Sequence, residues 1–257
     1  MPSAAILQVF EHFREDIDDA NDRRERLIKA SRDVTNISKK AIFLLHRLIL
    51  EDSGDERALA LRAASEGRAK LAESHAIFAL MRPELVGDRF WRHHRQVSPG
   101  LQEYIEALSF AHYLEQGTLI SYAQVQAALS DADGPFFTLP VADYLLGLSD
   151  LTGELMRFAI SNLGRRSGRT KANEVCAFVR NCKADFELFT PHVRDLCKKQ
   201  HVTASSLEKI EAAAYTVVVR GSEYDLAPEA LDDIVSKASA RFSDHDSHQD
   251  HVVYNDV

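Results

Sequence analysis

The stretch from residue 3 to residue 53 contains neither proline nor glycine, the two residues that most often end a helix. Within it, thirteen positions from Ile6 to Leu48 follow an alternating spacing of four and three residues, and ten of them are apolar. This heptad-like pattern predicts one very long helix with an apolar seam. Such a helix would run roughly 70 Å, which is more than the width of a domain of this size. It must therefore pack along other long helices or project toward a partner chain.

Proline and glycine divide the rest of the chain into shorter segments with helical spacing of apolar residues. The chain has only 11 glycines and 7 prolines, which favours long helices over an all-β fold. We therefore predict an all-α protein. The later helices are predicted over residues 56–80, 83–95, 98–115, 140–164, 172–188 and 203–220, with short ones starting at 121 and 190 and loops at 131–139 and 165–170.

Two parts of this prediction depend on particular residue types. Ser98 and Pro99 are typical of the first residues of a helix, so we expect one helix to end before them and another to begin there. The run from Thr216 to Val219 is β-branched and locally favours a strand. We predict a helix there, because Leu207 and Ile210 begin an apolar helical spacing that continues through the run.

We expect one helical domain over residues 1–225, since the sequence contains neither an internal repeat nor a linker that would separate a second domain. Residues 226–257 are predicted to hold a further helix, near residues 228–240, and then a polar tail rich in His and Asp. The composition of this tail is typical of a partly disordered segment.

The net charge of −8 argues against a protein that binds nucleic acid nonspecifically over its whole surface, because such proteins are usually basic. Local basic patches, or a basic partner chain, are still compatible with it. The three cysteines form no C-x-x-C pair, which favours a reducing compartment. The longest apolar runs are too short to span a bilayer. We therefore expect no membrane partner and a cytoplasmic and nuclear localisation.

Two pairs of acidic residues have a spacing that places both carboxylates on one side of a helix. Asp150 and Glu154 are four residues apart, and Glu103 and Glu106 are three apart. Each pair can be a solvated helix face, with Arg157 as the partner of the first pair. Alternatively, the two pairs converge into an all-oxygen site, which suits Mg²⁺ or Mn²⁺.

Such a metal site would support hydrolysis of a phosphodiester, because the metal lowers the pKa of a bound water and neutralises charge on the phosphate. A di-iron centre is the rival use of carboxylates on helices, and it usually needs Glu-x-x-His motifs. None of the four acidic residues has a histidine three positions later. The sequence therefore argues against a di-iron centre.

A basic segment precedes the helix that carries Glu103. Its cations are interleaved with Phe90 and Trp91, a combination that can hold single-stranded nucleic acid by phosphate contact and base stacking. The alternative is a surface helix with two buried aromatic rings. A second basic patch lies at 165–171 and is more often simply solvated. The predicted nucleic-acid-binding residues are Arg89, Arg92, His93 and Arg95.

Six segments of the sequence, in this order along the chain, resemble the landmarks of the translin superfamily. The acidic segments Glu103–Glu106 and Asp150–Leu155 are similar to those of its translin-associated factor X (TRAX) branch rather than to translin itself. The six segments are Ser31–Thr35, Phe43–Arg47, Leu101–Phe110, Asp143–Gly147, Asp150–Arg157 and Val219–Glu223.

The resemblance implies a single-domain bundle of about seven helices with a very long first helix. It also implies assembly with translin into a hetero-octamer in which this subunit type is a Mg²⁺-dependent endoribonuclease. The substrates would be single-stranded RNA, such as passenger-strand or tRNA-precursor fragments, and single-stranded DNA as a further ligand. By motif match, the family's metal-binding and catalytic carboxylates fall on Glu103, Glu106, Asp150 and Glu154. The alternative is a scaffold or nucleic-acid-binding subunit that stabilises translin without catalysis.

Overall fold

The computed structural model describes residues 4–51, 55–163 and 168–223. These residues form seven α-helices, one short 3-10 helix and one pair of two-residue strands, which confirms the predicted all-α fold. The α-helices are α1 (Ala4–Ile49), α2 (Glu56–Met81), α3 (Arg89–Gln116), α4 (Tyr122–Ala128), α5 (Val141–Asn162), α6 (Gly168–Phe189) and α7 (Leu196–Glu223).

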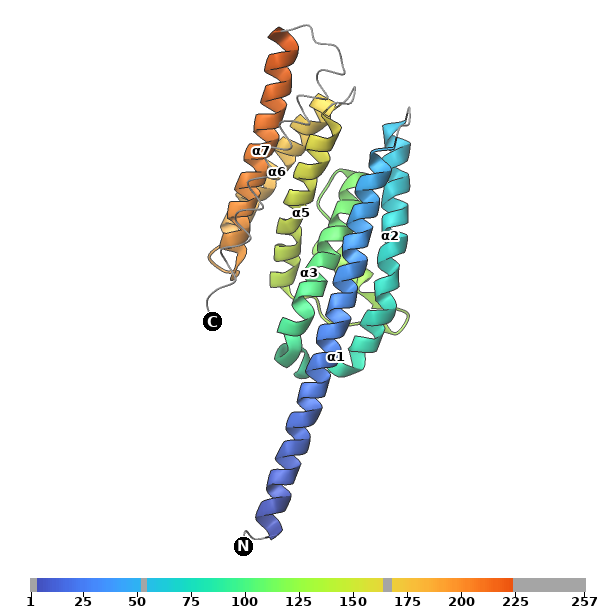
Figure 1. Cartoon of the computed structure of the whole chain (residues 1–257), viewed down its shortest axis with the longest axis vertical. Helices are drawn as coiled ribbons and strands as arrows, with labels where there is room; N and C mark the ends of the chain where they lie inside the picture. The colour runs from blue at the N-terminus through green and yellow to red at the C-terminus, as the bar shows by residue number, and fades with distance from the viewer. Residues whose placement is uncertain (1–3, 52–54, 164–167, 224–257) are drawn as a thin grey trace. The chain divides into compact units, whose positions relative to one another are not determined.

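The chain divides into two compact units, Met1–Gly147 and Leu148–Val257, and their boundary falls inside α5. In the first unit, α1, α2 and α3 run side by side (Figure 1). The second half of the predicted seam on α1 is their shared core, where Val34, Ala41 and Leu45 are fully buried. Small residues let the helices approach closely. A Cβ added at Gly100 of α3 would lie 2.5 Å from the Ser31 carbonyl oxygen.

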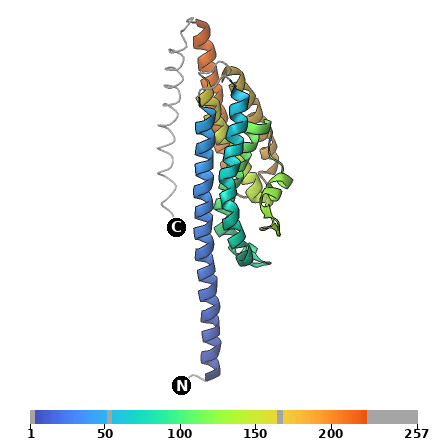
Figure 2. The ribbon, with the colours of Figure 1, turned by 90° about the vertical axis from the view of Figure 1, so that its right-hand side faces the viewer.

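The first part of α1 extends beyond α2 and α3, as Figures 1 and 2 show. Every residue from 6 to 22 is exposed. The apolar seam nevertheless continues through this stretch, where Phe10 is 66% exposed and Ile17 is 60% exposed. The predicted long helix is therefore confirmed, and within the described part of the first unit nothing covers the start of its seam.

The predicted break at Ser98 and Pro99 is wrong, because α3 continues through both residues from Arg89 to Gln116. Pro99 is exposed, so the helical hydrogen bond that it cannot make is lost on the solvent side. Tertiary hydrogen bonds hold the turn on the other side. The Gly100 amide donates to Ser31 Oγ at 3.0 Å, and Ser98 Oγ donates to Asp143.

The segment between α2 and α3 also differs from the prediction, since only a 3-10 helix, Arg82–Leu85, forms there. The predicted short helix from Ser121 is confirmed as α4, with its capping box. The loop predicted after it contains a small hairpin of β1 (Ser130–Asp131) and β2 (Gly134–Pro135). Arg82 holds this hairpin, because Nη2 donates to Asp131 at 2.6 Å and to the Gly134 carbonyl at 2.9 Å.

The second unit contains the rest of α5 together with α6 and α7, which pack against each other. The helix predicted over 203–220 begins earlier, at Leu196, and α6 begins at Gly168 rather than at 172. The short helix predicted at Thr190 is a turn, which ends at Asp195 in the left-handed conformation (φ 68°). The β-branched run after Thr216 is helical, as predicted.

The predicted helix at 228–240 and the His/Asp-rich tail lie outside the described residues. None of the helices in the described ranges is both long and apolar enough to cross a membrane.

Candidate functional site

In the second unit, α5 presents one polar pair beside an apolar face. Leu148, Leu151 and Leu155 are buried and hold the helix in the core. Asp150 and Glu154 lie on the adjoining stripe, one turn apart. The Glu154 side chain is 7% exposed and that of Asp150 is 23% exposed, so neither carboxylate lies on a freely solvated face.

Each of these carboxylates faces one cation. Lys199 Nζ on α7 donates to both oxygens of Asp150, at 2.6 and 2.7 Å. Arg157 Nη1, one turn further along α5, donates to Glu154 Oε1 at 2.8 Å. Burial raises the pKa of Asp150 above the value of an ordinary aspartate, while Lys199 lowers it and the nearby Glu154 raises it further. Asp150 and Glu154 thus bring two negative charges close together, and Lys199 and Arg157 each neutralise one of them.

Sequence reasoning anticipated Arg157 but not Lys199. The helix that carries Lys199 was predicted to begin only at Thr203, so Lys199 was assigned to no helix face. The structure begins α7 seven residues earlier, and this start places Lys199 and Thr203 on the same side of the helix. Thr203 Oγ1 lies 3.1 Å from Thr152 Oγ1 on α5, which fixes the register of the two helices.

The other predicted acidic pair lies on α3, in the first unit. Glu103 and Glu106 are both half-buried, beside the buried Tyr104 and Ile105. Lys39 Nζ on α1 lies 3.5 Å from Glu103 Oε1, so a lysine faces this pair as well. Each of the two predicted acidic pairs therefore has one carboxylate that lies against a lysine.

The two acidic pairs belong to different units, and the convergence of all four carboxylates stays a prediction. Within the described part of each unit, no group of three or more His, Cys, Asp or Glu side chains is placed to hold a metal ion. The chemistry of the donors nevertheless fits Mg²⁺ or Mn²⁺, since all four are carboxylates. The same carboxylates already attract a cationic side chain where one is within reach.

A buried aspartate anchors the predicted basic segment to α5. Asp143 is 1% exposed, and its carboxylate accepts hydrogen bonds from Ser98 Oγ at 2.5 Å and from Gln102 Nε2 at 2.8 Å. His94 Nε2 lies 2.5 Å from its other oxygen. These contacts fix the orientation of the first turns of α3. The sequence analysis gave Asp143 no such role, because its hydrogen-bond partners lie 41 to 49 residues away in the chain.

The basic segment presents its cations and one aromatic ring to solvent. Arg89, Arg92 and Arg95 are exposed, as is Trp91, which is 64% exposed, while Phe90 is buried beneath it. The alternative of two buried aromatic rings is therefore wrong for Trp91.

His93 differs from the other predicted contacts of this segment. It is half-buried, and burial and the nearby Arg23 lower its pKa. Its positive charge is thus weaker near neutral pH than that of the arginines. The second basic patch lies mostly outside the described residues, which resume at Gly168.

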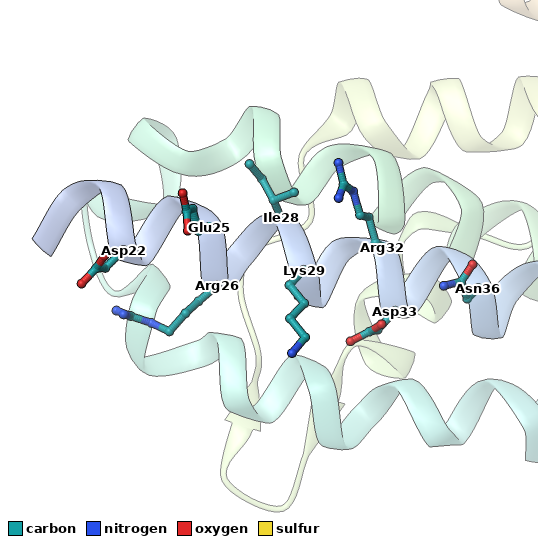
Figure 3. A pocket seen from close by; sticks show the side chains of 8 residues that line it. All are labelled: Asp22, Glu25, Arg26, Ile28, Lys29, Arg32, Asp33 and Asn36. Atoms are coloured by element: carbon teal, nitrogen blue, oxygen red, sulfur yellow. The ribbon is translucent and has the colours of Figure 1, made fainter. Parts of the chain in front are cut away.

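A cavity of about 740 Å³ lies along α1 (Figure 3). All of its lining side chains come from one face of this helix. Three of them are acidic and three are basic, so their charges cancel and the cavity favours neither anions nor cations. The lining residues are Asp22, Glu25, Arg26, Ile28, Lys29, Arg32, Asp33 and Asn36.

Residues 22–221 match the model of the Translin family. A translin-associated protein X from Rattus norvegicus is 34% identical over 242 residues, which cover 86% of this chain and 81% of the relative. The chain belongs to the translin family. The translin-associated protein X homolog of Schizosaccharomyces pombe is 30% identical over 83% of the chain, whereas translin of Gallus gallus is 27% identical over 55%. These values fit the translin-associated protein X branch.

Two solved structures share the fold of this chain. A chain of apo-NeC3PO aligns with a TM-score of 0.60 at 17% identity, covering 82% of this chain and 95% of that one. A chain of the AfC3PO–duplex RNA complex aligns with a TM-score of 0.61 at 19% identity, covering 83% of this chain and 98% of that one. These likenesses confirm the translin-like fold predicted from the sequence.

Proposed function

We propose that this translin-family chain is a Mg²⁺-dependent endoribonuclease subunit that cleaves single-stranded RNA inside a hetero-oligomer with a translin partner. The observation that carries the proposal is the pair of shielded carboxylates on α5, Asp150 and Glu154, which lie side by side in the segment whose sequence resembles that of the TRAX branch. Two carboxylates that are shielded from water cost free energy, and a cation that binds both of them reduces this cost.

In this proposal, Asp150 and Glu154 hold the metal, and Glu103 and Glu106 are the further ligands. When bound, Mg²⁺ supplies an activated water and neutralises the charge that develops on the phosphate. The protein's own part is orientation. Arg157 holds Glu154 at 2.8 Å, and the two hydrogen bonds from Lys199 fix the plane of the Asp150 carboxylate.

The exposed end of α3 supports a single-stranded substrate. Trp91 offers an exposed ring on which a base can stack, and Arg92 and Arg95 offer charges for the phosphates. Asp143 fixes this turn through His94 and Ser98, so the cations keep one arrangement. The AfC3PO chain was solved in a complex with duplex RNA, and we propose RNA binding for the present chain as well.

The exposed start of α1 supports a partner chain. Its seam of Ile6, Phe10, Phe13 and Ile17 continues the buried seam of the first unit without a break in spacing. A partner helix with the same spacing would bury it. Relatives named translin make a translin-type chain the proposed partner, and we propose a hetero-octamer that works in the cytoplasm and the nucleus.

One observation favours a second candidate function, that of a scaffold without catalysis. Lys199 donates to both oxygens of Asp150, which is also what a structural ion pair between α5 and α7 would look like. A scaffold needs this pair only to hold the helices together. A nuclease needs the carboxylate itself.

The test is cleavage of a labelled single-stranded RNA by the chain co-purified with its translin partner, in Mg²⁺ and then in EDTA. The variants are Asp150→Asn and Glu154→Gln, and Glu174→Gln on the exposed face of α6 is the matched control. A nuclease loses cleavage in EDTA and at least about 100-fold in rate in either site variant, because one carboxylate ligand of the metal is gone.

The control should cut like the wild type, and all variants should assemble with the partner. Equal, metal-independent cutting by wild type and both site variants would remove the carboxylate mechanism. No cutting by any intact assembly would leave the scaffold as the better account.

A further inference from the structure

A second cavity, of about 250 Å³, lies within the second unit between α5 and α7. It has room for roughly eight water molecules, which is enough for a phosphate group and part of the sugar attached to it. Three lining residues come from α5 and five from α7. They are Gly153, Met156, Arg157, His201, Val202, Ser205, Ser206 and Lys209.

The lining of this cavity contains hydrogen-bond donors and basic groups but no carboxylate. Arg157 and Lys209 carry positive charge, His201 carries an imidazole, and Ser205 and Ser206 offer hydroxyls. The cavity along α1 makes a useful comparison, because its three acidic and three basic groups cancel. Of these two cavities, only the one between α5 and α7 has the composition that selects an anion.

The cavity is built by the packing of the two helices. Gly153 leaves its α5 side open, since a Cβ added there would meet no atom within 4 Å. Thr203 Oγ1 bonds Thr152 Oγ1 at 3.1 Å and fixes α7 against α5 at this level. His201, Ser205 and Lys209 follow at intervals of four residues, so that α7 presents all three on one face.

The cavity adjoins the candidate metal-binding pair. Arg157 lines it and also donates to Glu154 Oε1 at 2.8 Å, while Gly153 lies on α5 between Asp150 and Glu154. An anion in the cavity would therefore sit beside the carboxylates. A nucleic-acid strand carries one phosphate per nucleotide, at a regular spacing. One of its phosphates can therefore lie in the cavity while a neighbouring phosphate lies at the carboxylates.

We propose that the cavity between α5 and α7 binds a backbone phosphate of the single-stranded RNA, next to the phosphodiester that is cut. This inference rests on the proposed nuclease function and adds to it the residues that position the strand. Lys209 and His201 contact the phosphate, Ser205 and Ser206 donate to its oxygens, and Arg157 connects the phosphate to Glu154.

The test measures binding rather than cleavage. A fluorescently labelled single-stranded RNA is titrated with the assembled complex in EDTA, at several salt concentrations. The variants are Lys209→Gln and Ser205→Glu, which puts an acidic group into the cavity. The matched control is Lys198→Gln, which removes a lysine of α7 that is 85% exposed and outside the cavity lining.

Lys209→Gln should weaken RNA binding about 3- to 10-fold and reduce the slope of log K against log salt by about 0.7, the value for one phosphate contact to a single strand. Ser205→Glu should weaken binding more, and Lys198→Gln should leave both quantities unchanged. Equal binding by Lys209→Gln, Ser205→Glu and wild type, with intact assembly, would overturn the inference.

Two further measurements separate the sources of failure. Mg²⁺-dependent cutting at saturating RNA by wild type and by Lys198→Gln, whose lysine lies outside the cavity lining, tests the nuclease by itself. Thermal unfolding with inorganic phosphate tests a free anion as ligand. One outcome would overturn the proposal. Submillimolar phosphate would stabilise the wild type but not Lys209→Gln, while both would bind RNA equally well. The cavity would then be a site for a free anion and not for a phosphate of RNA.

Discussion

At the scale of single residues, the carboxylate of Asp150 is subject to opposing influences. Burial and Glu154 disfavour its charge, and Lys199 favours it through two short hydrogen bonds. The sequence could predict the pairing of Asp150 with Glu154, because both lie on one helix and their spacing is local. It could not predict Lys199, which is 49 residues away and reaches Asp150 only through the packing of two helices.

The Lys199→Met substitution tests this balance. It leaves a shielded carboxylate without its cation, so we expect a loss of about 1–3 kcal/mol in the free energy of unfolding in EDTA, less than for a fully buried pair. Mg²⁺ should restore more stability to the variant than it adds to wild type, because the metal replaces the missing charge. Denaturant unfolding with and without Mg²⁺ measures both effects.

The double variant Asp150→Asn, Lys199→Met is the control, because it removes both charges. It should be more stable than Lys199→Met alone and should not respond to Mg²⁺ in this way. A response of equal size in the double variant would show that Mg²⁺ acts elsewhere.

At the scale of helices, local signals and tertiary contacts contribute differently. The heptad spacing of α1 and the capping box of Ser121 are local, and both predictions are confirmed. The break predicted at Pro99 is wrong because Ser31 and Asp143, both distant in sequence, hold that turn of α3 in place. The start of α7 was missed because its flanking turn contains no glycine. Asp195 takes the left-handed conformation instead.

Two glycines in helices should respond in opposite ways to the same change. Gly100→Ala puts a methyl group 2.5 Å from the Ser31 carbonyl oxygen and would push α1 and α3 apart, at a cost of about 1–3 kcal/mol. Gly153→Ala meets no atom within 4 Å and should stabilise α5 by roughly 0.5–1 kcal/mol, since alanine favours a helix more than glycine does. Chemical denaturation of the two variants compares them directly. Unchanged stability of Gly100→Ala would contradict the packing described for α3, and a loss of stability in Gly153→Ala would contradict the open space described at α5.

At the scale of the whole molecule, the start of α1 is the feature that points beyond the chain. Its seam was predicted from the sequence, with packing along other long helices or projection toward a partner as the two alternatives, and the structure leaves Phe10 and Phe13 exposed. Which chain covers them is not encoded in the spacing, because the partner's sequence supplies half of that interface. The charge of −8 likewise fits a subunit whose partner contributes cations to RNA binding.

Phe10→Glu combined with Phe13→Glu should therefore weaken assembly with the translin partner at least about 10-fold, because each charge would have to be buried in the seam. The isolated chain should keep its stability, since both positions are exposed in it. Leu80→Glu on α2, where the side chain is 77% exposed, is the control. Sedimentation of the mixed chains measures the assembly, and unchanged assembly of the double variant would separate this seam from the interface.

The central claim is that Asp150 is a ligand of the catalytic metal, and a change of metal preference tests it most directly. Asp150→Cys replaces a hard oxygen ligand by a thiolate, which binds Mg²⁺ poorly and softer ions such as Cd²⁺ well. Cleavage of single-stranded RNA by the assembled complex is measured in each metal, with wild type as the reference. We expect the variant to lose cleavage in Mg²⁺ and to regain it in Cd²⁺ or Mn²⁺, relative to wild type in the same metal. Full activity of Asp150→Cys in Mg²⁺, or a loss that no metal restores while the complex stays intact, would contradict the claim.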